Sequence, residues 1–141
     1  MHKIANRTYI LFIMLLFGSC FSVKSGFQVK YNTFKAKKPT APHYTLEIKK
    51  DSVYYNGIAN VNILGKRSVK ISKVELQNLK EAFEKNNFLS LNETYQGNKR
   101  DIPVTSIFYK NHTVTFQKEY APEQLKEINN VLENLVKNLE R

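Results

Sequence analysis

Few side chains in this sequence have the types and spacing that catalysis or metal binding requires. Its 141 residues include one cysteine and three histidines. Cysteine-rich zinc and iron–sulfur sites are therefore excluded. A metal site would have to combine His43, His112 and Asp101 from distant segments, because His2 lies at the extreme N-terminus. Nothing in their spacing indicates convergence, so we expect no metal, no cofactor and no catalytic residue.

A serine-hydrolase triad is not predicted either. Ser68, His112 and Asp101 come from separate segments, and no serine lies on the strand–turn–helix elbow that exposes a nucleophile. Asp101 is the acidic residue best suited to face a ligand, because it lies in the polar stretch 92–103. The alternative is a structural role, in which its carboxylate accepts hydrogen bonds from nearby backbone N–H groups.

The tyrosines suggest a binding face rather than a reaction. Tyr54 and Tyr55 are adjacent on a predicted strand, so their side chains point to opposite faces and one of them is exposed. An exposed tyrosine beside Tyr109 or Tyr120 would form a binding face, since binding interfaces are rich in aromatic anchors. Cross-strand packing within the sheet is the alternative. Tyr54, Tyr55, Tyr109 and Asp101 are thus the candidate ligand-facing residues.

The single cysteine ends a segment with a recognisable layout. Cys20 follows a short basic start, an unbroken apolar run over 9–17, and the small residues Gly18 and Ser19. This is the layout of a secretory signal peptide, and the run is shorter than the roughly 20 residues that span a bilayer. Positions 17–20 resemble the lipobox of bacterial lipoproteins, except that Phe17 stands where leucine is usual. The resemblance implies cleavage before Cys20 and attachment of palmitate-like acyl chains to it; an ordinary signal peptide is the alternative.

The formal net charge of +10 suggests nucleic-acid binding until it is divided along the chain. Residues 1–19 carry two cations and no acid, and residues 21–39 carry five lysines and no acid. Residues 40–141 carry fifteen cations against twelve acids. The globular part is nearly balanced, and export would separate it from cellular nucleic acid. We therefore expect no nucleic-acid partner.

Length and composition predict one small domain. The chain has room for one ordinary domain, and its 42% hydrophobic content excludes a disordered chain. We expect a signal peptide at 1–19, a lipidated cysteine with a basic tether at 20–41, and a single domain at 42–141. Apolar residues alternate over 27–35, which leaves a strand on the domain edge as an alternative for that part of the tether.

Periodicity within the domain predicts strands and helices in the order βββαββα. Ser72 and Glu75 form a capping box at the start of the first helix. The predicted elements are three strands between 44 and 71, a helix from 72 to 86, strands at 104–109 and 113–120, and a helix from 122 to 139. This order is typical of an α+β fold, with an antiparallel sheet of about five strands and two amphipathic helices that cover one face.

Four short motifs carry a resemblance to a known family. They are Pro42-x-Tyr44 with Gly57 ending a strand, Asn87-Phe88-Leu89, Asp101-x-Pro103, and Ala121-Pro122-x-x-Leu125. Residues from about 42 to 139 resemble an uncharacterised family of small bacterial envelope domains, catalogued as domain of unknown function 6438. Many members carry Cys-x-x-Cys where Lys38 and Ala41 stand here, so no redox or disulfide role is implied. The resemblance implies a fold and an envelope location, and no activity.

These observations predict a bacterial envelope lipoprotein. We expect Cys20 to hold it on a membrane by lipid, with the domain facing the periplasm. The domain would be a non-catalytic binding or scaffolding module whose partner is an envelope protein. Two alternatives stay open: a small envelope hydrolase that uses the 92–103 loop, and a periplasmic inhibitor or chaperone-like module that binds polypeptide through its sheet edge.

Overall fold

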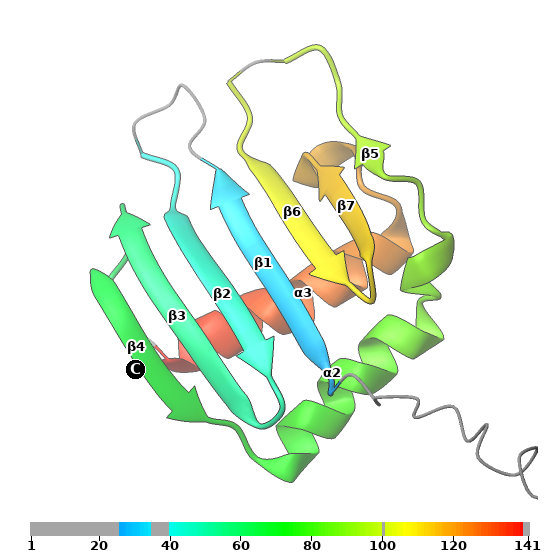
Figure 1. Ribbon diagram of the computed structural model, residues 1–141. Helices are drawn as coiled ribbons and strands as arrows, with labels where there is room; N and C mark the ends of the chain where they lie inside the picture. Colours follow the sequence, from blue (N-terminus) through cyan, green and yellow to red (C-terminus); the bar gives the residue numbers. More distant parts are fainter. Residues whose placement is uncertain (1–25, 35–39, 100, 140–141) are drawn as a thin grey trace, which may run out of the picture.

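The computed structural model describes residues 26–34, 40–99 and 101–139. They form one seven-stranded sheet, in the order β4-β3-β2-β1-β6-β7-β5, with one α-helix behind it and another across its lower end (Figure 1). The elements are β1 (Gln28–Phe34), β2 (His43–Lys49), β3 (Ser52–Ala59), β4 (Gly65–Lys70), α2 (Lys73–Lys85), β5 (Thr94–Tyr95), β6 (Val104–Tyr109), β7 (His112–Phe116) and α3 (Glu123–Leu139), with 3-10 turns at Phe88–Ser90 and Lys118–Tyr120. The predicted signal peptide at 1–19 and Cys20 lie outside the described residues.

The α+β class is confirmed, but the predicted sheet of five antiparallel strands is wrong in two respects. The sheet has seven strands, and it is mixed, because β5 pairs in parallel with β7. The neighbouring strands elsewhere in the sheet are antiparallel. β5 has only two residues, which is too short for any alternation of apolar and polar side chains to reveal it.

The strand that the sequence leaves as an alternative over 27–35 is present as β1, but it lies at the centre of the sheet and not on its edge. β1 pairs with β2 on one side and with β6 on the other. Val29 and Tyr31 are 0% and 1% exposed, whereas Lys30 between them points away from the core. The domain therefore includes residues that the sequence assigns to the tether.

The core lies between the sheet and the two helices. Alternate side chains of the central strands point toward the helices, and α3 supplies Leu125, Ile128 and Leu132, which are fully buried. At the end of the sheet where α2 crosses, the ring centroids of Phe83 and Tyr109 lie 4.6 Å apart. The other side chains of the same strands point away from the helices. We call this second surface of the sheet the open face, since no described helix covers it (Figure 1).

The predicted capping box starts α2. The backbone N–H of Glu75 donates to Ser72 Oγ at 3.1 Å, and the backbone N–H of Ser72 donates to the Glu75 carboxylate at 2.9 Å. These bonds satisfy backbone donors that lack intrahelical partners at a helix start. The helix is thereby fixed at the point where the chain leaves β4.

A chain of polar contacts that begins in the core and ends at the surface ties β1 to α3. Tyr31 Oη donates to Asn129 Oδ1 at 3.0 Å, and Asn129 Nδ2 donates to Glu133 Oε1 at 2.8 Å. The other Glu133 oxygen lies 3.0 Å from Lys118 Nζ. Burial raises the pKa of Tyr31, and nearby Tyr44 and Glu133 raise it further, so the phenol keeps its proton and remains a donor. Because buried polar groups require partners, this chain sets the position of β1 on α3.

Candidate functional site

The structure separates the four candidate ligand-facing residues. Tyr54 lies on the open face and is 47% exposed. Tyr55 and Tyr109 are 2% and 4% exposed and point toward the helices. Asp101 is exposed in the loop before β6. The prediction that Tyr54 and Tyr55 point to opposite faces is confirmed, but Tyr109 cannot share a surface with Tyr54.

Asp101 and His112 lie at opposite ends of the β6–β7 hairpin. Asp101 precedes β6, whereas His112 begins β7 and pairs with Tyr109 beside the turn. A six-residue strand spans about 20 Å, so the two side chains do not converge. His112 Nε2 lies 2.9 Å from the carbonyl oxygen of Leu91, and its ring packs edge-on against Phe88. No cluster of three or more His, Cys, Asp or Glu side chains that could hold a metal ion occurs within the described ranges.

The polar loop before β6 is attached to the domain by Gln117. Gln117 Oε1 accepts a hydrogen bond from the backbone N–H of Gly97, and its Nε2 donates to the carbonyl oxygen of Lys99, both at 2.8 Å. Gln117 itself is buried. The ring of Tyr120 lies so close to Gly97 that a Cβ there would come within 2.1 Å of it. Tyr120, which the sequence pairs with an exposed tyrosine, therefore packs against this loop.

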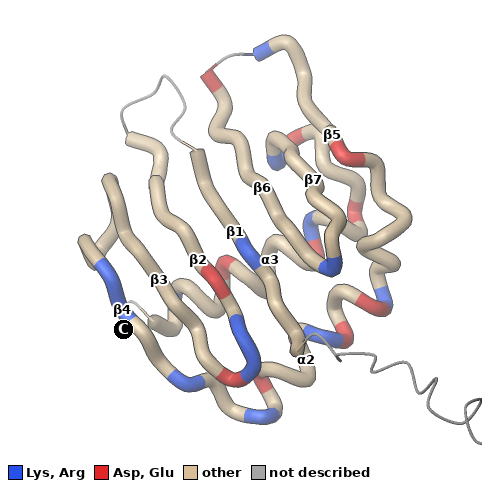
Figure 2. Tube along the Cα trace, in the orientation of Figure 1, with Lys and Arg blue, Asp and Glu red and all other residues tan. Residues whose placement is uncertain are grey.

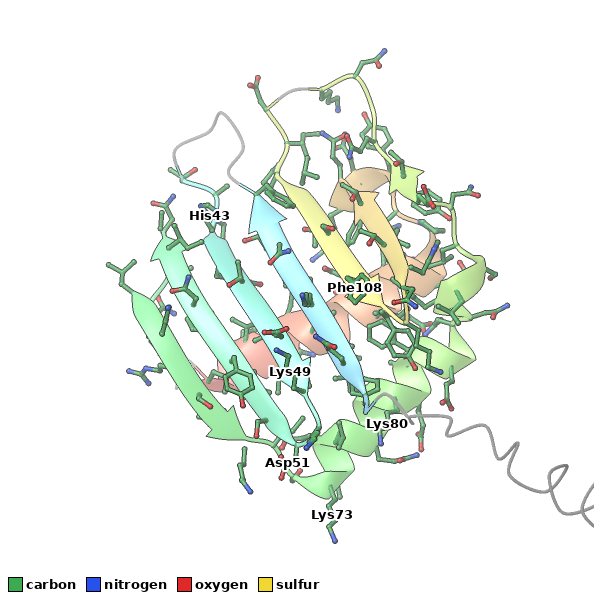
Figure 3. The ribbon with its side chains drawn as sticks, in the orientation of Figure 1. His43, Lys49, Asp51, Lys73, Lys80 and Phe108 are labelled. Carbon is green, nitrogen blue, oxygen red and sulfur yellow. The ribbon has the colours of Figure 1, made fainter. Side chains whose placement is uncertain are left out.

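A row of polar side chains, six amides and hydroxyls with one lysine at its end, crosses the whole open face. Strand register places Lys66, Asn56, Thr45, Asn32, Ser106, Thr115 and Thr94 side by side, one from each strand from β4 to β5. Amides and hydroxyls both donate and accept hydrogen bonds. The row therefore offers hydrogen-bonding groups along its whole length to a partner that presents donors or acceptors. Figure 3 views the sheet from this side.

The adjacent row adds aromatic rings and charges. From β4 to β7 it contains Ser68, Tyr54, Glu47, Lys30, Phe108 and Thr113. Lys30 Nζ lies 3.8 Å from Glu47 Oε1 and 5.8 Å from the centre of the Phe108 ring. Figure 3 shows Phe108 on β6 within this face. Two rings thus flank an ion pair in one line across the sheet.

An open depression of about 420 Å³ lies beside Tyr54. Its lining comprises Thr45, Glu47, Tyr54, Tyr55, Asn56, Lys66, Arg67 and Ser68. Most of these residues belong to the two rows just described. The open face is therefore hollowed over β2, β3 and β4. A ligand in this hollow can contact the Tyr54 ring and the polar row together.

Glu47 is ionised on this face. Burial raises its pKa, but hydrogen bonds from Lys49 and Gln28, together with the charges of Lys49 and Lys30, outweigh burial and hold the pKa of Glu47 below its ordinary value. Lys49 Nζ lies 3.0 Å from Glu47 Oε1, and Gln28 Nε2 donates to the same oxygen at 3.1 Å. The centre of the open face therefore carries a fixed negative charge between positive ones.

The sheet edges are less suited to binding than the open face. β4 is exposed along its length and carries Lys66, Arg67 and Lys70. Charged side chains on an edge strand oppose pairing with another strand. At the other edge, β5 offers only two residues. The geometry thus favours the open face over strand addition at an edge.

Phe108 and Lys30 belong to this surface although the sequence does not single them out. The alternation of side chains along a strand identifies Phe108: Ile107 and Tyr109 are buried, so the side chain of Phe108 between them must point outward. The same argument applies to Lys30 once Val29 is assigned to the core. Alternation assigns both residues to the open face only once the strands are placed in one sheet.

A family model described as "Domain of unknown function (DUF6438)" matches residues 40–136. The match runs from just before β2 into α3 and does not include β1. No curated protein matches the chain. Among the described helices, none has the length and apolar character needed to cross a membrane.

Proposed function

The chain belongs to the DUF6438 family, and from this premise we propose that it is a bacterial envelope lipoprotein whose domain binds a partner protein through the open face of its sheet. The family has no assigned activity, so the proposal rests on the site. The observation that carries it is the line across the open face in which Tyr54 and Phe108 flank the Glu47–Lys30 ion pair.

The spacing of the two rings supports a macromolecular partner. Tyr54 and Phe108 lie on β3 and β6, with β2 and β1 between them. Three steps between neighbouring strands separate the two residues by about 14 Å. A few aromatic anchors surrounded by polar groups are the usual composition of a binding interface. Such a surface suits contact with another protein better than enclosure of a small substrate.

A non-catalytic role is supported by the placement of the acid–base residues. Asp101 and His112 occupy opposite ends of the β6–β7 hairpin, and His112 packs against Phe88 and Leu91. General acid–base catalysis requires such groups within hydrogen-bonding reach of one reacting centre. In the part of the chain that the structure describes, Asp101 and His112 do not form such an arrangement, which weighs against the hydrolase alternative.

The membrane anchor is supported by the sequence before the domain. Cys20 ends the signal-like segment, and two or three acyl chains would hold the protein firmly, since each buried methylene contributes about 0.8 kcal/mol. Only five residues lie between Cys20 and Gly26, the first described residue. A chain of this length spans about 20 Å at most. The domain would therefore stay close to the membrane surface.

Substitution of the cysteine tests the anchor. We expect Cys20→Ser to abolish incorporation of labelled palmitate and to move the protein out of the membrane fraction, because the thiol that receives lipid is lost. Cell fractionation and metabolic labelling measure both effects, with Ser22→Ala as the matched control that should remain anchored. Unchanged processing and membrane association of Cys20→Ser would contradict the lipoprotein assignment.

Site-directed crosslinking tests the binding face. We expect a photoreactive phenylalanine analogue in place of Tyr54 or Phe108 to form crosslinked adducts in intact cells, because both rings would lie within the interface. The same analogue in place of Val74, which is 68% exposed on α2, is the control and should give few adducts. Equal adduct yields at the open face and at Val74 would argue against the proposed interface.

A further inference from the structure

Lysines gather at the end of the domain where β1 begins. This end consists of the start of β1, the β2–β3 turn, the end of β4, α2 and the β6–β7 turn, and runs along the lower and lower right side of the domain in Figure 1. Figure 2 shows both positive and negative residues along it. We call it the lysine end and define it by Lys50, Lys70, Lys73, Lys80 and Lys110.

Most of these lysines are not neutralised. Lys50, Lys73, Lys80 and Lys110 form no salt bridge within the part of the chain that the structure describes. By contrast, Lys70 Nζ lies 3.4 Å from Asp51 Oδ2.

Two lysines of α2 lie at this end, and Lys80 is the one beside the start of β1. Lys73 and Lys80 are seven residues apart, which is two helical turns, so they share one side of α2. Figure 3 shows both at this end of the molecule. Lys80 Nζ lies 5.7 Å from the centre of the Phe27 ring.

Glu84, one turn after Lys80, is the acid on the same side of the helix. The elements of this end also carry Asp51, Glu75 and Glu81. With Lys85 added to the five defining lysines, six positive charges stand against four negative ones, so positive charge prevails by two.

The same end receives the chain from Cys20. Gly26 lies beside Lys50: a Cβ on Gly26 would be 3.7 Å from Lys50 Cγ, and the backbone N–H of Lys50 donates to the carbonyl oxygen of Phe27 at 3.1 Å. The chain from Cys20 to Gly26 spans about 20 Å at most, so a lipid on Cys20 would keep this end close to the headgroups. Lysines near an anionic membrane surface are attracted to it, and salt screens that attraction.

We propose that the lysine end rests on anionic lipid headgroups of the membrane that holds the Cys20 lipid. The inference rests on the proposed lipid anchor and adds the orientation of the domain. The strands then rise away from the bilayer, so the open face looks sideways and stays free for a partner. The loop before β6, with Asp101, lies at the end farthest from the membrane.

Vesicle binding by the unlipidated chain tests this orientation separately from the anchor. The chain from residue 20 onward, carrying Cys20→Ser, is mixed with vesicles of phosphatidylcholine alone or of equal parts phosphatidylcholine and phosphatidylglycerol. We expect binding to the anionic vesicles alone, and loss of binding as salt is raised. Lys73→Gln, Lys80→Gln and Lys110→Gln combined should weaken the association by about tenfold or more.

A second triple variant controls for total charge. Lys66→Gln, Arg67→Gln and Lys137→Gln remove three cations away from the lysine end and should leave vesicle binding within about twofold of the parent chain. An equal loss in both triple variants, or equal binding to both kinds of vesicle, would overturn the proposed orientation. Thermal unfolding checks that each variant is folded. If Cys20→Ser releases the protein from cell membranes but the unlipidated chain ignores anionic vesicles, the orientation fails and the lipoprotein assignment stands.

Discussion

A chain that begins at residue 40 is expected not to fold, whereas a chain that begins at residue 26 is expected to unfold cooperatively. Residue 40 is where the family match starts, so it is the natural boundary to choose for expression. That boundary removes β1, which lies between β2 and β6. Without it, the sheet would divide into the strand groups β4-β3-β2 and β6-β7-β5, which have no strand pairing in common.

The size of the loss follows from what β1 buries. Val29 and Tyr31 are completely enclosed, and burial of each such side chain contributes about 1.5–3 kcal/mol. Removal of Tyr31 also leaves Asn129, which is 1% exposed, without the phenol that donates to it. The apolar side chains of β2 and β6 would be uncovered as well. These losses are comparable with the whole free energy of unfolding of a small domain, which is about 5–15 kcal/mol.

Circular dichroism and urea unfolding of the two chains measure this effect. The chain from residue 26 is the control, and it should show a single sigmoidal transition. The chain from residue 40 should show no cooperative transition and should aggregate or expose apolar surface. A shared, equally steep transition in both chains would mean that β1 is dispensable. The protein chain used in binding experiments on this domain should accordingly begin at residue 26 or earlier.

The misassigned strand shows where sequence reasoning stops. The alternation of Phe27, Val29 and Tyr31 is visible in the sequence, but the lysines around it carry no acidic partner in the same segment and are typical of a solvated tether. In the structure, Lys30 finds its partner in Glu47 on β2. That ion pair, and the pairing of β1 with β6 70 to 80 residues later, depend on long-range register that no local pattern contains. The local signals were sufficient for the helices, whose starts and apolar stripes are encoded within a few turns.

The residues of the candidate site are likewise predictable from the sequence only in part. Alternation predicts that Tyr54 and Tyr55 point to opposite faces, and this holds. Which face becomes core depends on where α2 and α3 pack, so the sequence alone groups Tyr109 with an exposed ring, although Tyr109 packs against Phe83. Phe108 is the ring that shares the open face. To assign Phe108 to the open face, one must know which side chains of β6 share a face with those of β1. The pairing of the two strands in the fold shows this.

Gly57→Ala is expected to be the most destabilising single substitution among the glycines, at about 3 kcal/mol. Gly57 is a buried position of β3, and the segment after that strand folds back over it. A Cβ at Gly57 would lie 1.9 Å from the backbone oxygen of Ile63, 2.8 Å from Val61 Cγ2 and 2.9 Å from Tyr55 Oη. Because the closest atom is backbone, no rotation of a side chain relieves the overlap.

The cost arises because the segment over Gly57 would have to move as a unit. Tyr55 Oη donates to the Ile63 carbonyl oxygen at 3.3 Å, and displacement of that oxygen would break the bond at an added cost of about 1 kcal/mol. Gly26→Ala is the matched control, because its Cβ would meet only Lys50 Cγ at 3.7 Å, which is ordinary contact. Gly97→Ala should fall between the two, since the obstacle there is the 40% exposed ring of Tyr120, which can turn away. Urea unfolding should therefore show the smallest loss in the free energy of unfolding for Gly26→Ala, a larger loss for Gly97→Ala and the largest for Gly57→Ala. If the Gly57→Ala protein is as stable as the Gly26→Ala protein, the segment over β3 is not packed as described.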